Sequence, residues 1–180
     1  PIIIGGDFNV IPTDDDVYEP NNFKNDACAH PKTRKLYRIL IVLPGNFQQA
    51  LSMVKNIKES IFELSSKKYR YYIKLHPLID NESSKSKLML RIPENCSFID
   101  QSFSESLFNS NLVITTGNTG TIYESLARGI PVIIFEDPNG FSFSIKPDNI
   151  SKQIWRYCRT YQDISDSIEY YASRPKEELS

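Results

Sequence analysis

The stretch that decides the fold runs from Asn111 to Glu136 and reads NLVITTGNTGTIYESLARGIPVIIFE. It begins with a short apolar run, residues 112–114, which is typical of a strand buried on both faces of a parallel sheet. A second apolar run, residues 132–135, predicts another buried strand. Between the two runs the pattern predicts a helix over about 121–128, because the Gly-Ile-Pro that follows ends it. The stretch therefore predicts one strand–helix–strand unit.

The turn between the first strand and the helix has the composition of an anion-binding loop. Its glycines permit positive φ and a close approach of the backbone, and Asn118 or Thr119 can cap the helix. A helix N-terminus behind such a turn, at the carboxyl end of a strand, favours phosphate binding. The alternative is a tight turn that binds nothing. The residues predicted to bind phosphate are Thr115, Thr116, Gly117, Asn118, Thr119 and Gly120.

The sequence around this unit continues the alternation of strands and helices. Further strands are expected at 39–43, 69–75 and 97–99, and helices at 47–64, 104–108, 151–157 and 162–172. The polar, serine-rich residues 80–87 favour a solvated loop. Short turns between alternating elements predict an α/β fold, a Rossmann-like parallel sheet with flanking helices.

Other turns and one helical side chain are expected to face the same crevice, because the carboxyl ends of parallel strands meet at one edge. Gly45 and Asn46 follow the first strand, and His76 follows the second. The His76 imidazole can donate to a phosphate leaving group, although a histidine after a strand is often structural. Glu124, on the first turns of the helix, can accept hydrogen bonds from sugar hydroxyls, or it can be an ordinary solvated residue.

Two motifs resemble the donor-binding half of GT-B glycosyltransferases. TTGNTGTIYESLARGIPVI is similar to their donor turn and helix, in particular in the bacterial surface-polysaccharide group with capsule-synthesis, polysialyl- and glycerophosphate-transferases. A strand that ends in His76-Pro77 is similar to the last two of these. The resemblance implies a nucleotide-sugar or CDP/CMP-type donor, with its ribose at Glu124 and its phosphate at His76 and the turn. Where relatives use a Ser-Ser pair, this chain has threonines around glycines.

The GT-B resemblance also implies a saccharide acceptor, bound in the complete enzyme by a second domain. These residues carry only the donor half, so we expect them to bind donor without transferring sugar. The expected location is the cytoplasm, and peripheral association with a membrane at its inner face stays open. A non-catalytic α/β binding module is a further alternative.

The first 37 residues resemble a different family. GGDFNVIPTDDDVYEP and NDACAHPKTR are similar to the exodeoxyribonuclease III type of AP endonuclease, in the endonuclease–exonuclease–phosphatase superfamily. That resemblance implies Mg²⁺-dependent DNA cleavage, with Asp7 activating water and Asn9 beside phosphate and metal. Such a site takes ligands from several strands, so we interpret Asp7 and Asn9 as a remnant. The predicted organisation is a nuclease-like strand-and-loop segment over 1–37, a nucleotide-sugar-binding domain over 38–175, and a C-terminal end over 176–180.

The amino-acid composition argues against nucleic-acid binding, a zinc or disulfide framework, and a membrane span. Lys and Arg total 21 against 22 Asp and Glu, a formal net charge of −1, so no overall positive field favours nucleic acid. Cys28, Cys96 and Cys158 are scattered, which fits reduced thiols better than a zinc site or a disulfide framework. No apolar run approaches the ~18 residues of a membrane span. We expect no cofactor and no metal, except Mg²⁺ under the nuclease alternative.

Overall fold

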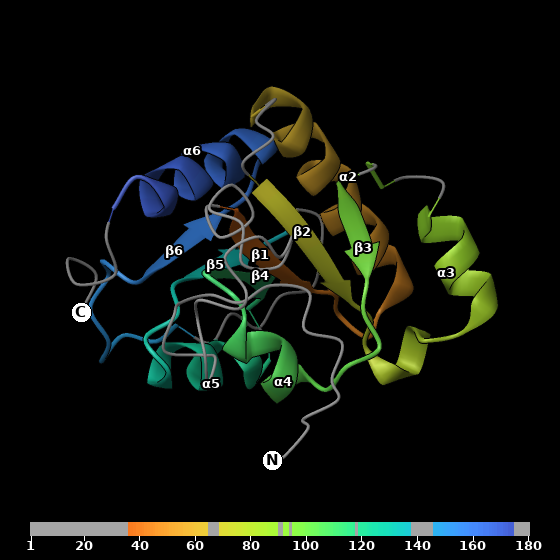
Figure 1. Cartoon of the computed structure of the whole chain (residues 1–180), viewed down its shortest axis with the longest axis horizontal. Coiled ribbons are helices and arrows are strands. Elements are labelled where there is room, and N and C mark those ends of the chain that lie inside the picture. The colour runs from red at the N-terminus through yellow and green to blue at the C-terminus, as the bar shows by residue number, and fades with distance from the viewer. Residues whose placement is uncertain are drawn as a thin grey trace, which may run out of the picture. The chain divides into compact units, whose positions relative to one another are not determined.

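The computed structural model describes residues 36–64, 69–89, 92–93, 95–117, 119–137 and 146–174. Within these residues the chain forms a six-stranded sheet in the order β3-β2-β1-β4-β5-β6, and every neighbouring pair of strands is parallel. The strands are β1 (Tyr37–Val42), β2 (Tyr69–Lys74), β3 (Cys96–Phe98), β4 (Leu112–Thr116), β5 (Val132–Phe135) and β6 (Trp155–Cys158). This is the predicted Rossmann-like sheet (Figure 1).

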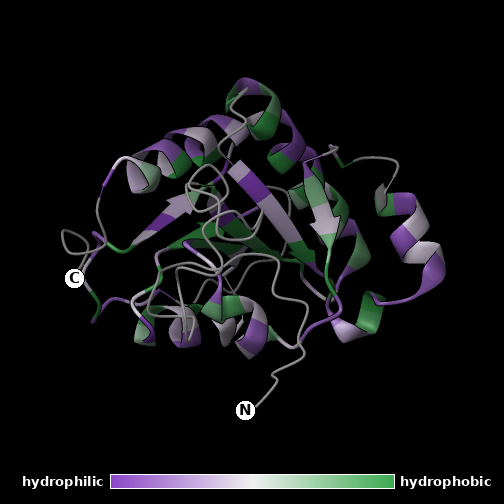
Figure 2. Cartoon of the chain, in the orientation of Figure 1, coloured by the Kyte–Doolittle hydropathy of each residue, from purple (hydrophilic) through white to green (hydrophobic). Residues whose placement is uncertain are grey.

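Helices cover both faces of the sheet. The described helices are α2 (Phe47–Leu64), α3 (Glu82–Met89), α4 (Phe103–Phe108), α5 (Thr121–Ala127) and α6 (Tyr161–Ala172), with a short 3₁₀ helix η3 (Pro77–Ile79). Figure 1 shows α2 and α6 above the sheet and α4 and α5 below it. The two sides form separate apolar cores. In α2 and α6 the hydrophobic residues lie toward the sheet and polar residues lie on the outer side (Figure 2).

Strands β1 and β4, at the centre of the sheet, are buried on both faces. Ile39 and Ile41 of β1 contribute to the core under α2 and α6, whereas Leu40 contributes to the core over α4 and α5. All three side chains have no exposed surface. A strand buried on both faces needs an uninterrupted apolar run rather than an alternating one, and this is why β1, β4 and β5 were predictable from sequence.

Two predicted segments are wrong. Residues 151–157 were expected to be helical, but the chain makes turns there and then enters strand β6. Ile154 and Tyr157 have helical spacing, which explains the misleading pattern. In the structure β6 adds to the edge of β5: Val132 N donates to Ile154 O at 2.9 Å, and Glu136 N donates to Cys158 O at 2.9 Å. Hydrogen bonding to a distant strand therefore overrides the local pattern.

The second wrong segment is the expected loop over residues 80–87, most of which belongs to α3. Asn81 Oδ1 accepts a hydrogen bond from Ser84 N at 2.9 Å, a contact of the capping type at the start of the helix. Leu88 has no exposed surface and anchors the helix to the core under α2. Among the described side chains of α3, Leu88 alone is buried, so the sequence shows no amphipathic stripe that would reveal this helix.

Candidate functional site

The strand order reverses between β1 and β4, so we expect a ligand crevice outside the carboxyl ends of these two strands. The sheet grows from β1 in one direction through β2 and β3, and in the other through β4, β5 and β6. Open α/β sheets bind ligands where the order reverses in this way. Ile41 is level with Ile114, and Val42 is level with Lys74, so β1, β2 and β4 end close to one level. The turns that follow them leave the sheet at the same edge, as expected.

His76 and Gly45 lie directly against each other at this edge. A Cβ atom added to Gly45 would lie 3.0 Å from His76 Nδ1 and 3.2 Å from Cε1. Only a residue without a side chain leaves room for the imidazole in its present position. The first and second strands therefore bring their turns together, which the sequence predicted only as a shared edge.

The hydrogen bonding of His76 sets which ring nitrogen can donate. Its Nδ1 accepts a hydrogen bond from Leu78 N at 3.2 Å, and this bond starts η3, whose first residue is Pro77. A neutral imidazole that accepts at Nδ1 carries its proton on Nε2. The His76 side chain is exposed, so Nε2–H can donate to a ligand oxygen at the crevice.

Asn46 serves the fold more than the crevice. Its side-chain oxygen accepts hydrogen bonds from Gln48 N at 3.0 Å and from Gln49 N at 3.1 Å. Its main-chain oxygen accepts from Ala50 N at 2.9 Å. These contacts cap the first turn of α2, so the part of Asn46 left for a ligand is its side-chain NH₂ group.

The turn after β4 is held together by its own hydroxyl groups. Thr115 is buried, and its Oγ1 lies 3.3 Å from Thr121 Oγ1. Thr119 Oγ1 lies 3.1 Å from the same Thr121 oxygen and accepts a hydrogen bond from Thr121 N at 3.3 Å. Two of the threonines predicted to bind phosphate thus brace the start of α5 through Thr121, a residue outside the predicted phosphate turn. Thr116 is half-buried at the end of β4.

The glycines of this turn have different surroundings. Gly117 is buried and Gly120 is exposed, while Asn118 lies outside the described residues. Gly120 has φ −64° and ψ −16°, and a Cβ atom there would meet nothing within 4 Å. Neither the backbone nor the packing needs glycine at this position. Close approach of a ligand to the backbone would explain why glycine is present at position 120.

The Glu124 carboxylate is bound by a neighbouring helix. Its Oε1 accepts from Ser104 Oγ at 2.6 Å and from Arg128 Nη2 at 3.0 Å. The spacing of Glu124 and Arg128 is readable as an i, i+4 ion pair. Ser104, on α4, was not predicted to contribute and has no local sequence signal. The Glu124 side chain keeps 40% of its surface exposed.

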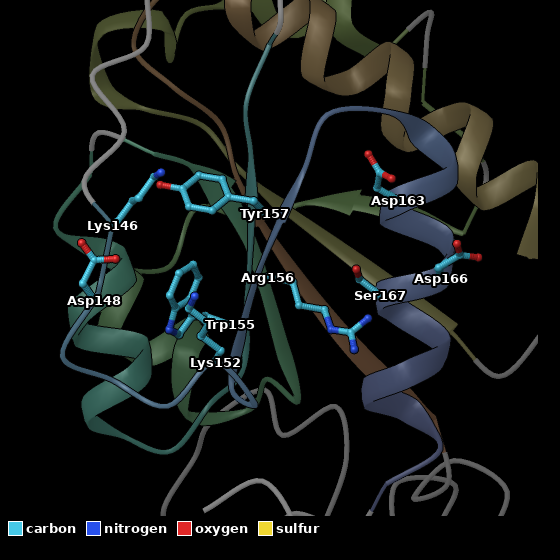
Figure 3. A pocket seen from close by; sticks show the side chains of 9 residues that line it. All are labelled: Lys146, Asp148, Lys152, Trp155, Arg156, Tyr157, Asp163, Asp166 and Ser167. Atoms are coloured by element: carbon cyan, nitrogen blue, oxygen red, sulfur yellow. The ribbon is translucent and has the colours of Figure 1, made fainter.

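A cavity among the described residues lies elsewhere, on the outermost strand β6 and separated from β4 by β5. It encloses about 580 Å³. Figure 3 shows Arg156 and Ser167 on the α6 side of the strand and Trp155 and Tyr157 on the other side. The charged lining residues are Lys146, Lys152, Arg156, Asp148, Asp163 and Asp166. Cations and carboxylates balance, so the groove gives no net attraction for an anionic donor.

Three further features considered from the sequence are the nuclease-like segment, a metal site and a membrane span. Asp7 and Asn9, with the whole nuclease-like segment, lie outside the described residues. Among the residues that the structure does describe, no three His, Cys, Asp or Glu side chains gather as a metal site would require. In the same part of the chain, no helix has both the length and the apolar character needed to cross a membrane.

Residues 30–150 match the model of a transferase family, the LIC12162 family. The chain belongs to this family. The match includes β1 to β5 and all three turns at the crevice. It confirms the predicted kinship with transferases, whereas the resemblance of the first 37 residues to a nuclease stays a prediction.

Individual relatives agree with the family match. An uncharacterized glycosyltransferase of Methanosarcina mazei is 36% identical over 97 residues, which make up 52% of this chain and 23% of the relative. The calicheamicin glycosyltransferase has a TM-score of 0.59 at 15% identity, over 84% of this chain and 38% of that one. UDP-GlcNAc 2-epimerase from Neisseria meningitidis, bound to UDP-GlcNAc, has a TM-score of 0.55 at 21% identity, over 76% and 38%.

The solved structures establish the fold: the sheet and its helices form a Rossmann-like half of the GT-B type. The chain spans less than a quarter of the Methanosarcina relative and about two fifths of each of the two solved structures.

Proposed function

We propose that this member of the LIC12162 transferase family binds a nucleotide-sugar at the crevice between β1 and β4, as the donor half of a glycosyltransferase. The observation that carries the proposal is that three turns, those after β1, β2 and β4, leave the sheet at one edge. They supply the exposed His76, the close Gly45, and the threonine–glycine turn that leads into α5. Family membership and the GT-B fold support the same assignment.

The chemistry of the crevice suits a nucleoside diphosphate leaving group. When a sugar leaves its nucleotide, negative charge develops on the terminal phosphate, and hydrogen-bond donors aimed at that charge stabilise the transition state. Nε2–H of His76 is one such donor. Gly117 and Gly120, in the turn after β4, permit close approach of a phosphate to the backbone, and Glu124 offers carboxylate oxygen to the ribose. We assign phosphate binding to His76 and the turn, and ribose binding to Glu124.

Finer features of the function rest on resemblance. Because the epimerase structure holds UDP-GlcNAc, a uridine nucleotide is the first donor to test, with CMP- and CDP-linked sugars as the alternative that the His-Pro motif suggests. The surface-polysaccharide motifs support a saccharide acceptor and a cytoplasmic site of action. The described residues form one Rossmann-like domain, so we infer that they bind donor and need a second domain for transfer.

Calorimetric titration of the chain with UDP, UDP-GlcNAc, CMP, CDP and GDP tests the proposal. We expect one nucleotide class to bind and to raise the melting temperature, because a ligand specific for the native state stabilises it. His76→Ala and Glu124→Ala should each weaken binding by about 10- to 150-fold, the loss of one hydrogen bond to a charged group.

Lys55→Ala, an exposed change on α2, is the matched control and should leave binding unchanged. A folded protein that responds to none of these nucleotides at millimolar concentration would refute the proposed function. Binding that survives both His76→Ala and Glu124→Ala would place the nucleotide elsewhere on the molecule.

A further inference from the structure

A small polar network surrounds the Glu124 carboxylate and connects α4 with α5. Ser104 Oγ donates to Glu124 Oε1 at 2.6 Å, and Arg128 Nη2 donates to the same oxygen at 3.0 Å. Arg128 also donates to Ser104 twice, from Nη1 to the main-chain oxygen at 3.1 Å and from Nη2 to Oγ at 3.2 Å. Each of the three side chains therefore contacts the other two.

The network uses one oxygen of the carboxylate and leaves the other. A carboxylate offers about four acceptor positions on its two oxygens. Both hydrogen bonds recorded for Glu124 end on Oε1, and within the described residues none ends on Oε2. Because 40% of the Glu124 side chain is exposed, we expect a ligand to reach the carboxylate at Oε2. The adjacent 2′- and 3′-hydroxyls of a ribose are two hydrogen-bond donors. Both can donate to Oε2, or one can donate to each carboxylate oxygen.

Ordering a side chain before the ligand arrives improves affinity. A free glutamate has many rotamers, and fixing it during binding costs free energy. Here Ser104 and Arg128 fix it in advance. Their contacts come from α4 and from the end of α5, so movement of either helix would change the direction of the carboxylate.

We propose that Ser104 and Arg128 are positioning residues, which hold the Glu124 carboxylate for the ribose hydroxyls of the donor. This inference rests on the proposed function. The competing explanation is that Glu124 and Arg128 form a solvent-exposed ion pair that contributes little to stability or to binding. The two explanations differ in one measurable respect: a positioning role concerns only ligands that carry the ribose hydroxyls.

The experiment compares two ligands on the whole chain. The probes are UDP and 2′,3′-dideoxy-UDP, which share the base and the phosphates and differ at the two hydroxyls. If another nucleoside diphosphate binds in the titrations above, it and its dideoxy analogue replace them. Calorimetry gives the dissociation constants for wild type, Ser104→Ala, Arg128→Gln, Arg128→Lys and Glu124→Gln, and circular dichroism checks that each variant is folded.

For the wild type we expect UDP to bind more tightly than the dideoxy analogue. Ser104→Ala and Arg128→Gln should weaken UDP binding by about two- to tenfold, the cost of ordering one side chain, and leave dideoxy-UDP unchanged. Arg128→Lys should restore part of the loss. Once Glu124 is replaced by Gln, adding Ser104→Ala should have little further effect, because the two changes act through one carboxylate.

Three results would overturn the inference. Equal losses for both ligands would show a general structural effect, and unchanged UDP binding in both variants would show an idle ion pair. Equal wild-type affinity for UDP and its dideoxy analogue would remove the ribose contact itself, while phosphate binding, and with it the proposed function, would stand. Absence of any nucleotide binding by the folded wild type would instead defeat the proposed function and this inference together.

Discussion

Gly45→Ala is expected to separate ligand binding from stability. The added methyl group would lie 3.0 Å from His76 Nδ1, 3.2 Å from His76 Cε1 and 3.2 Å from Leu78 Cδ1. Contacts this short force the neighbours to move by a few tenths of an ångström. His76 and Leu78 are both exposed, so they can move outward into solvent. The imidazole would then leave its present position against Gly45.

Two effects of opposite sign determine the free energy of unfolding of Gly45→Ala: a lost hydrogen bond and a more restricted unfolded chain. Loss of the 3.2 Å hydrogen bond from Leu78 N to His76 Nδ1 costs about 0.5–1.5 kcal/mol. Replacing glycine where the backbone does not need positive φ stabilises by about 0.4–1 kcal/mol, because the unfolded chain loses freedom. The free energy of unfolding should therefore change by less than about 1 kcal/mol. Donor affinity should fall by about 10- to 150-fold, as for His76→Ala.

Urea unfolding followed by circular dichroism measures the first quantity, and titration with UDP or the nucleotide that binds measures the second. Gly129→Ala is the control for stability, because its φ of +67° makes alanine cost about 1–2 kcal/mol. Lys55→Ala, exposed on α2, is the control for affinity, which it should leave unchanged. Full donor affinity in Gly45→Ala, beside a large loss in His76→Ala, would refute the geometric reasoning.

Further predictions concern the turn after β4 and the start of α6. Gly120→Ala should stabilise the free protein by about 0.4–1 kcal/mol, since nothing lies within 4 Å, and weaken nucleotide binding; unchanged affinity in titration would exclude close approach of phosphate to this backbone. Thr160→Ala should lower the free energy of unfolding by about 0.5–2 kcal/mol in urea melts, because Thr160 Oγ1 accepts from Asp163 N; no change would contradict the cap. Partial burial raises the pKa of the Asp163 carboxyl, but hydrogen bonds from Arg159 N and Thr160 leave it below its usual value. Its stabilising contribution is present above that usual value and is lost as pH falls through the depressed one. Asp163→Asn should therefore destabilise the protein near neutral pH and progressively less as the pH falls below the usual carboxyl range, and an effect that does not change with pH would refute this assignment.

The parts of the fold that were predictable from sequence carry strong local patterns. The buried runs of β4 and β5 and the apolar stripe of α2 have the observed bounds or nearly so. Gly129 has φ +67° just after α5, as expected of the residue that follows a helix. The two elements that were predicted wrongly, α3 and β6, depend on contacts with residues outside their own segments. Leu88 anchors α3 in the core, and hydrogen bonds to β5 hold Trp155–Cys158 extended.

The same division applies to the candidate site. The sequence by itself determined which residue types follow β1, β2 and β4, and that they share one edge, because a parallel sheet collects its strand ends. Only the tertiary structure decided that His76 rests on Gly45, that Thr115 and Thr119 bond to Thr121, and that Glu124 is held by Ser104 from another helix. These contacts join residues as many as 31 positions apart, and their distances depend on strand order and helix packing, which no local pattern of side chains contains.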